Sequence, residues 1–225
     1  QLRRWLARNL SNRLSAFLAG MGLSMMLQSS TASALVVSSF QKKGLVTTAI
    51  ALCSVLGADL GSALMVRVLS LDIGALTPLL LFAGVVLYLK KERQASGQFG
   101  LILLGLAFVM MALRMISTAT APLKQMPELI GLFEQLANWP LLAVLAGMVM
   151  ALVCFSSLAV VMITAGTVAA DVVSPTAALW VVLGANLGSA FLAVITTWGS
   201  SNMARRAPTG NCLFRIGAFV FGTIL

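Results

Sequence analysis

The sequence has no histidine, and only 9% of its residues are charged. Without histidine the chain lacks the usual general base, zinc ligand and proton relay. Its three cysteines, Cys53, Cys154 and Cys212, are scattered through apolar segments without the spacing of metal ligands, so we interpret them as small apolar residues. The sequence also shows no pairing of a nucleophile with a base. These absences argue against an enzyme.

Hydrophobic residues make up 60% of the chain, a share that excludes an ordinary soluble domain. Apolar runs long enough to cross a bilayer, or half of one, predict an all-α polytopic protein in contact with membrane lipid. The chain does not begin with Met and ends inside an apolar run, so we expect a piece of a longer protein. The runs cover roughly residues 14–40, 45–70, 75–90, 99–120, 140–167, 174–198 and 212–225.

The net charge of +9 comes from basic residues that cluster between the apolar runs. This placement is typical of cytoplasmic loops in membrane proteins and does not indicate nucleic-acid binding. Arg67 and Arg114 lie inside apolar runs near their predicted outer ends, where we expect them to reach the interface. The four clusters are Arg3, Arg4, Arg8 and Arg13; Lys42 and Lys43; Lys90, Lys91 and Arg93; and Arg205 and Arg206.

Two stretches of the chain carry the same polar pattern at a constant offset of 127 residues. The copies align without a gap because every matched pair has this offset. A duplication that keeps hydroxyls, glycines and a carboxyl or amide in apolar surroundings is typical of a transporter built from repeats around a central site. The matched segments are 18–21 with 145–148, 29–30 with 156–157, and 57–63 with 184–190.

The basic clusters all lie on the cytoplasmic side only if residues 14–40 and 140–167 form re-entrant hairpins. Each hairpin would turn back at its Ser-Ser pair, and the three crossings between the hairpins would invert the second copy. The predicted fold is therefore two inverted-topology repeats, each a re-entrant hairpin plus a broken transmembrane helix. Residues 1–120 form the first repeat with its following helices, 121–139 an extracytoplasmic linker, and 140–225 the second repeat.

The predicted hairpin tips are candidates for an anion site. A helix that begins just after a Ser-Ser pair points free backbone N–H groups and a partial positive charge at the cavity. The alternative is that these hydroxyls bond to the preceding turn or join helices. The recurrence of the pair at the common offset favours substrate binding. The candidates are Gln28, Ser29, Ser30, Thr31, Ser156 and Ser157.

The duplicated glycine element is a candidate for a cation site. Asp59 occupies the centre of the first copy, and a carboxylate at membrane depth is costly unless a cation or a proton accompanies it. Exposed carbonyls of an unwound segment would suit Na⁺, whereas a protonated Asp59 would couple H⁺. Close helix packing is the alternative explanation of the glycines. The candidates are Asp59, Asn186, Gly57, Gly61, Ser62, Gly184, Gly188 and Ser189.

With these motifs the chain resembles the sodium/phosphate cotransporter family, in particular its bacterial branch. The family is recognised by a Gln-Ser-Ser-Ser/Thr motif in each inverted repeat and by a following Gly-Ala-Asn-Leu-Gly-Thr-like element. Gln28-Ser29-Ser30-Thr31 and the two Gly-Ala-Asp/Asn-Leu-Gly-Ser elements carry the resemblance over nearly the whole chain. The chain differs from the family pattern at Phe155, in place of Gln, and at Asp59, in place of Asn.

The resemblance implies sodium-coupled movement of inorganic phosphate across a bacterial inner membrane, with import or export left open. Na⁺ would be the coupling ion, and no other cofactor is expected. Some bacterial members carry a PhoU-like cytoplasmic domain after the membrane core, which makes such a domain a candidate partner. The alternative is a phosphate-sensing membrane partner of a cytoplasmic regulator that does not transport, because Phe155 removes an amide from one half-site.

Overall fold

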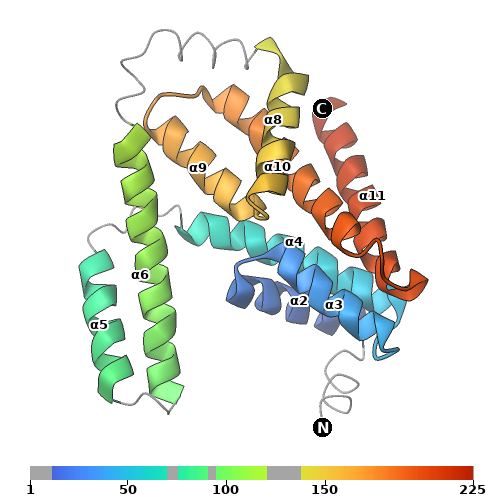
Figure 1. The fold of residues 1–225 in the computed structure, drawn as a ribbon, viewed down its shortest axis with the longest axis horizontal. Coiled ribbons are helices and arrows are strands. Elements are labelled where there is room, and N and C mark those ends of the chain that lie inside the picture. Colours follow the sequence, from blue (N-terminus) through green and yellow to red (C-terminus); the bar gives the residue numbers. More distant parts are fainter. Residues whose placement is uncertain (1–11, 70–75, 91–94, 121–137, 225) are drawn as a thin grey trace.

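The computed structural model describes residues 12–69, 76–90, 95–120 and 138–224 (Figure 1). These residues form helices and no strand, which confirms the all-α prediction. The predicted linker, apart from its last two residues, lies outside the described residues, as do the basic residues before Asn12. The helices are α2 Arg13–Leu27, α3 Ser30–Lys42, α4 Thr48–Leu69, α5 Thr77–Lys90, α6 Ala95–Thr120, α8 Pro140–Val153, α9 Ser157–Ala169, α10 Pro175–Thr196 and α11 Asn202–Ile224.

Two described helices are long and apolar enough to cross a membrane, and they are the two that carry the glycine elements. They span Thr48–Arg67 in α4 and Pro175–Thr196 in α10. The two halves of each predicted hairpin are shorter apolar helices: α2 and α8 have 15 and 14 residues, and α3 and α9 have 13 each. A full crossing needs about 20 residues, so helices of this length suit half-membrane elements.

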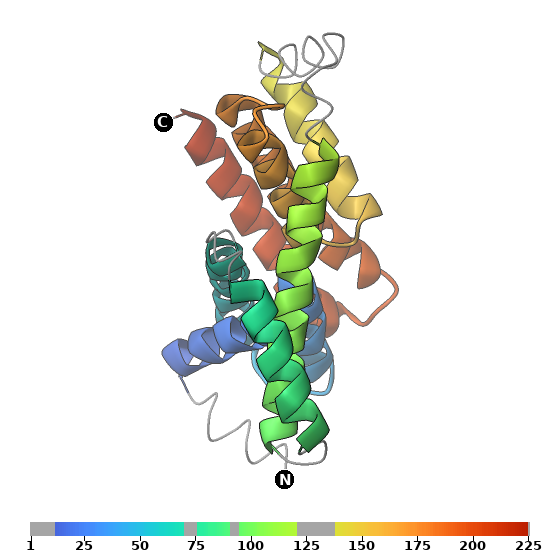
Figure 2. The same cartoon turned by 90° about the vertical axis from the view of Figure 1, so that its left-hand side faces the viewer.

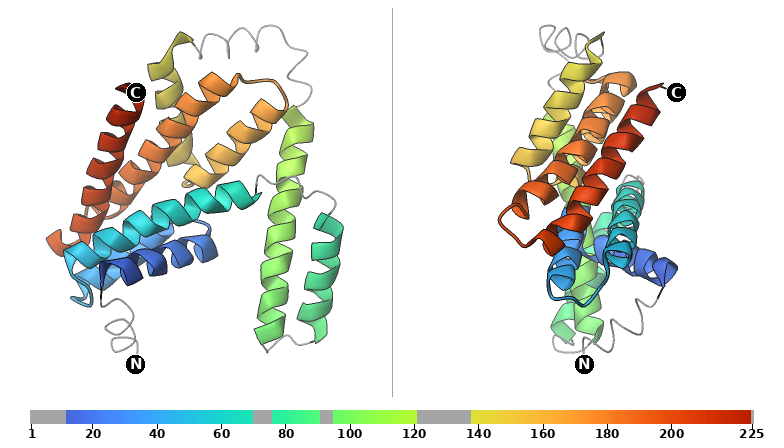
Figure 3. Two further views of the ribbon diagram at one scale, coloured as in Figure 1. Left: turned by 180° about the vertical axis from the view of Figure 1, so that it is seen from behind. Right: turned by 90° about the vertical axis from the view of Figure 1, so that its right-hand side faces the viewer.

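The helices form two similar groups and a further pair, α5 and α6, of which α6 also contacts α9. In the first group α2 packs along α4, and in the second α8 packs along α10 (Figure 1). Helices α5 and α6 pack on each other to one side (Figure 3). Helix α11 contacts α10 and also α3 and α4, so it joins the two groups (Figure 2).

Glycines explain why α2 and α8 approach their long partners so closely. A Cβ atom added to Gly20 would lie 1.8 Å from the Ser54 carbonyl oxygen, and one added to Gly147 would lie 2.0 Å from that of Val181. Both pairs are related by the 127-residue offset, so the two groups share one packing scheme. The same holds for Gly57 against Phe17 and Gly184 against Val144, at 1.9 Å each, and for Gly61 against Met21 and Gly188 against Met148, at 2.4 and 2.5 Å.

The predicted break in each crossing helix is wrong. Helices α4 and α10 run as continuous α-helix through residues 57–63 and 184–190. The glycines are needed here because two backbones come within contact distance, and no residue with a side chain fits. A backbone carbonyl inside a continuous helix accepts the i+4 N–H group, so Gly57, Gly61, Gly184 and Gly188 supply no unwound carbonyls.

Helix α11 is fastened to α3 by a polar contact that depends on a proline. Pro208 lies inside α11 and has no N–H group, so the carbonyl of Ala204 loses its helical partner. The hydroxyl of Ser38 donates to that carbonyl instead. Ser38 is buried, so this hydrogen bond is shielded from solvent. An apolar cluster of Ala34, Val37, Ala51, Val55 and Ala207 completes the contact among α3, α4 and α11.

Candidate functional site

The first helix break lies where the sequence predicts it, at Gln28 and Ser29. Gln28 ends α2 in the left-handed conformation, with φ 51° and ψ 30°, and Ser29 is the N-cap of α3 with φ −154° and ψ 113°. The Ser29 hydroxyl accepts a hydrogen bond from the backbone N–H of Ala32 at 3.1 Å. A left-handed conformation is uncommon for a residue with a side chain. The break is therefore a specific feature of this sequence and not a frayed helix end.

The second break reproduces the first. Phe155 has φ 53°, and Ser156 caps α9 with φ −154° and ψ 112°. The Ser156 hydroxyl accepts from the N–H of Ala159 at 3.2 Å. The Phe155 side chain is exposed, whereas the matching Gln28 is half-buried. Both repeats therefore present the N-terminus of a short helix with a serine cap, and the two differ in the residue just before the cap.

The predicted serines are not equally buried. Ser30 and Thr31, in the first turn of α3, are buried. Ser156 and Ser157, at the start of α9, are half-buried. The Ser30 hydroxyl contacts Arg215, a residue that the sequence motifs did not indicate.

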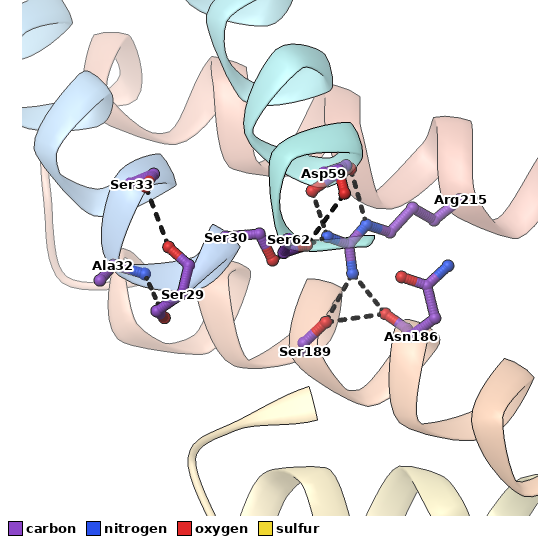
Figure 4. A network of polar contacts seen from close by, with 9 residues as sticks. All are labelled: Ser29, Ser30, Ala32, Ser33, Asp59, Ser62, Asn186, Ser189 and Arg215. Atoms are coloured by element: carbon purple, nitrogen blue, oxygen red, sulfur yellow. Dashed lines mark hydrogen bonds and ion pairs between the residues drawn. The ribbon is translucent and has the colours of Figure 1, made fainter. Parts of the chain in front are cut away.

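Arg215 of α11 lies at the centre of a polar network between the two repeats (Figure 4). Its Nε donates to Oδ2 of Asp59 at 2.9 Å, and its Nη2 donates to Oδ1 of the same carboxylate. Nη2 also donates to the Ser30 hydroxyl at 3.3 Å. Nη1 donates to the Asn186 carbonyl at 2.6 Å and to the Ser189 hydroxyl at 2.5 Å. The guanidinium thus joins α3 and α4 of the first repeat to α10 of the second.

The Asp59–Arg215 ion pair is largely removed from solvent. Arg215 is 5% exposed and the Asp59 side chain 20%. Because the pair is bidentate, both carboxylate oxygens are held in a fixed orientation. Such a pair adds little net stability, but removing one partner leaves an uncompensated charge, which typically costs about 3–5 kcal/mol. The network is therefore sensitive to the loss of either residue.

The two crossing helices contribute equivalent serines to this site. Ser62 donates to the Asp59 carbonyl at 2.9 Å, and Ser189 donates to the Asn186 carbonyl at 3.0 Å. The side chain of Asn186 is exposed, so only its backbone oxygen joins the network. Within the described part of the chain, no group of three or more His, Cys, Asp or Glu side chains forms a metal site.

The repeat pattern in the sequence does not indicate Arg215, because this residue has no counterpart in the other copy. The position 127 residues earlier is Tyr88, and residues 212–225 otherwise form an uncharged, mostly apolar run. Arg67 and Arg114, the two basic residues that the sequence analysis places inside apolar runs, are exposed. A usable signal was present: a carboxylate inside one apolar run calls for a basic partner inside another.

Comparison with known proteins finds one matching family model and several relatives of similar sequence. The family model described as Na⁺/Pi-cotransporter matches residues 1–118 and 124–223. The chain is 40% identical over 216 residues to a protein of Escherichia coli (strain K12) named "Putative inorganic phosphate export protein YjbB", covering 96% of this chain and 40% of that protein. The protein of the same name from Salmonella typhimurium is 40% identical over 221 residues, covering 98% and 41%.

A more distant relative is "Uncharacterized protein YqeW" of Bacillus subtilis, which is 25% identical over 205 residues, covering 90% of this chain and 66% of that protein. The chain spans about two fifths of the length of the more similar relatives. No solved structure shows significant similarity to the chain.

Proposed function

This chain belongs to the Na⁺/Pi-cotransporter family, and we propose that it is the membrane core of a secondary transporter that moves inorganic phosphate in a sodium-coupled cycle. The proposal includes a multi-pass location in a bacterial inner membrane. It assigns phosphate to the two serine-capped helix starts, with Gln28, Ser29, Ser30 and Thr31 from the first repeat and Ser156 and Ser157 from the second. It assigns Na⁺ to the region of Asp59, Ser62, Asn186 and Ser189.

The observation that carries the proposal is the near-identity of the two helix breaks. The N-cap serines have the same φ and differ by 1° in ψ, and each caps the third N–H group of its helix. A helix N-terminus has further N–H groups without intrahelical partners, and together with the helix dipole they favour an anion. Two such ends, each with hydroxyls, suit a tetrahedral oxyanion.

Charge in the network supports the same assignment. Arg215 lies within hydrogen-bonding distance of Ser30, so a permanent positive charge is next to the first serine pair. A planar guanidinium with several donors is well suited to phosphate. Asp59 supplies carboxylate oxygens, which a hard cation such as Na⁺ prefers.

The proposed arrangement in the membrane is the inverted repeat with re-entrant hairpins. The short α2–α3 and α8–α9 pairs support it, because each pair breaks where a hairpin would turn. The matched glycine contacts of α2 with α4 and of α8 with α10 support a common origin of the two groups. In this arrangement Lys42, Lys43, Lys90, Arg205 and Arg206 lie on the cytoplasmic side and Asp171 on the opposite side.

Flux of labelled phosphate into proteoliposomes of known orientation tests the proposal. We expect saturable flux that increases with a sodium gradient and is absent from protein-free vesicles, and the orientation that supports flux gives the direction. A potassium gradient of equal size is the control for osmotic and ionic-strength effects. Phosphate binding without flux, or flux that does not respond to a sodium gradient, would contradict the proposed cycle.

A further inference from the structure

We propose that Arg215 is a mobile substrate ligand that neutralises Asp59 in the empty site and leaves it when phosphate binds, so that Na⁺ must take its place. This inference rests on the proposed function and adds the physical link between the two solutes. Phosphate would bind to the guanidinium that now holds Asp59, and Na⁺ would bind to the carboxylate that now holds Arg215.

All the N–H donors of Arg215 are already in use. A guanidinium has five N–H groups. The five contacts of Arg215 go to both carboxylate oxygens of Asp59, to the hydroxyls of Ser30 and Ser189, and to the carbonyl of Asn186. An anion can therefore bind Arg215 only by replacing one of these acceptors.

The acceptor that phosphate matches in charge and geometry is the Asp59 carboxylate. It is the charged member of the set, and a phosphate presents two oxygens to the same fork of donors. The two acceptors on α10, the Asn186 carbonyl and the Ser189 hydroxyl, are neutral and can stay bound to the guanidinium beside an anion. Since Nη2 already reaches Ser30 at 3.3 Å, the guanidinium can approach an anion at the start of α3 without leaving the site.

The Asp59 carboxylate, in turn, needs a cation beside it. Its side chain is only 20% exposed, and the nearby Ser62 hydroxyl is already committed to a backbone carbonyl. A carboxylate that loses its partner in such a place carries a large penalty unless another cation arrives. Phosphate binding to Arg215 therefore creates a demand for a cation at Asp59, and a cation at Asp59 frees Arg215 for phosphate.

A second buried polar group on α11 has no partner among the described residues. Asn211 is 4% exposed, and its Oδ1 has no hydrogen-bond partner. It lies four residues before Arg215 on α11, so the two side chains share one face of that helix. Buried amide oxygens normally have a partner. An unpartnered amide oxygen therefore belongs to the face of α11 that carries Arg215.

Equilibrium binding of labelled phosphate to the purified full-length protein, with and without saturating Na⁺, tests the exchange. In the wild type we expect Na⁺ to tighten phosphate binding by about 5- to 150-fold, the usual range for coupled sites. Asp59→Asn releases Arg215, so it should bind phosphate more tightly than wild type in the absence of Na⁺ and should lose the sodium effect. Arg215→Gln should weaken phosphate binding at least tenfold.

A second measurement does not depend on phosphate. In Arg215→Gln the carboxylate of Asp59 is unpaired, so Na⁺ alone should raise the melting temperature of this variant more than that of wild type. The double variant Asp59→Asn/Arg215→Gln should lose this response. Arg206→Gln, an exposed position on the same helix, should match wild type in both measurements.

The outcomes separate the two proposals. If wild type shows no phosphate binding or flux at any Na⁺ concentration, the proposed function fails and the exchange fails with it. If wild type transports phosphate but Asp59→Asn keeps the normal sodium effect, a static ion pair is indicated and the exchange alone is overturned. If either single variant does not fold, the double variant Asp59→Asn/Arg215→Gln, which leaves neither charge unpaired, decides the question: a normal sodium effect on phosphate binding in this variant would overturn the exchange.

Discussion

Two glycines of α2 that lie two residues apart should respond in opposite ways to alanine. Gly20 contacts the backbone of α4, and a Cβ there would be 1.8 Å from the Ser54 carbonyl oxygen. Gly22 has nothing within 4 Å of the corresponding position. Gly22→Ala is therefore a matched control on the same helix, with the same chemical change and without the contact.

The expected magnitude follows from the geometry. An ordinary contact begins at 3.4 Å, so at Gly20 the added atom is about 1.6 Å too close. The obstacle is backbone, which cannot rotate away as a side chain can, so α2 must move from α4. Overpacking typically costs about 1–3 kcal/mol, and we expect the upper end of this range. Alanine favours a helix over glycine by about 1 kcal/mol at both positions, so this contribution cancels in the comparison.

Unfolding of the two variants in detergent, by heat or by denaturant, measures this difference. Gly20→Ala should be less stable than Gly22→Ala by about 3 kcal/mol, and Gly22→Ala should equal or exceed wild type. Because α2 ends at Gln28, its displacement should also disturb the serine cap and lower phosphate flux. Equal stability of the two variants would refute the conclusion that glycine is required for the α2–α4 contact.

Three further predictions concern the serines and the topology. Ser30→Ala removes a hydroxyl beside the proposed anion, so phosphate binding should weaken by about 1.5–3 kcal/mol, which is roughly 10- to 150-fold in affinity. Exposed Ser39→Ala should leave binding unchanged, and equal effects at the two positions would indicate a packing role. Ser38→Ala should destabilise the protein by about 1–3 kcal/mol without a specific change in phosphate affinity, because it strips the Ala204 carbonyl of its donor; an unaltered melting temperature would contradict this. Cysteines that replace Lys43, Lys90 and Arg206 should react with an impermeant reagent only from the cytoplasm, and a cysteine that replaces Asp171 only from outside. Labelling of positions 43 and 90 from opposite sides would exclude the re-entrant hairpins.

The features that could be predicted well from the sequence are those that occur in both copies of the repeat. The Ser-Ser pairs recur at a fixed offset, and both helix breaks fall beside them, at Gln28 and at Phe155. Local chemistry is sufficient here, because a serine that caps a helix bonds within three residues of itself. The all-α fold likewise follows from composition and the lengths of the apolar runs.

The features that the sequence did not predict depend on which helices meet. Glycines in a membrane helix are compatible with an unwound segment or with close packing, and only the approach of α2 to α4 decides for packing at Gly57. The hydrogen bond of Ser38 to the Ala204 carbonyl, which Pro208 leaves without a helical partner, joins α3 to α11 and follows only from the way these two helices meet. Arg215 occurs once, so the comparison of repeats passed over it, although it is the residue that joins them.

The ion pair between Asp59 and Arg215 also has an electrical consequence. Moving one elementary charge through 100 mV of membrane potential changes its energy by about 2.3 kcal/mol. Because these two side chains carry opposite charges and are held together, they contribute no net charge to a reorientation of the empty site. In the proposed cycle, voltage would therefore act on the steps that bring phosphate and Na⁺ to the site. The Asp59–Arg215 pair would add no voltage dependence to the return of the empty transporter.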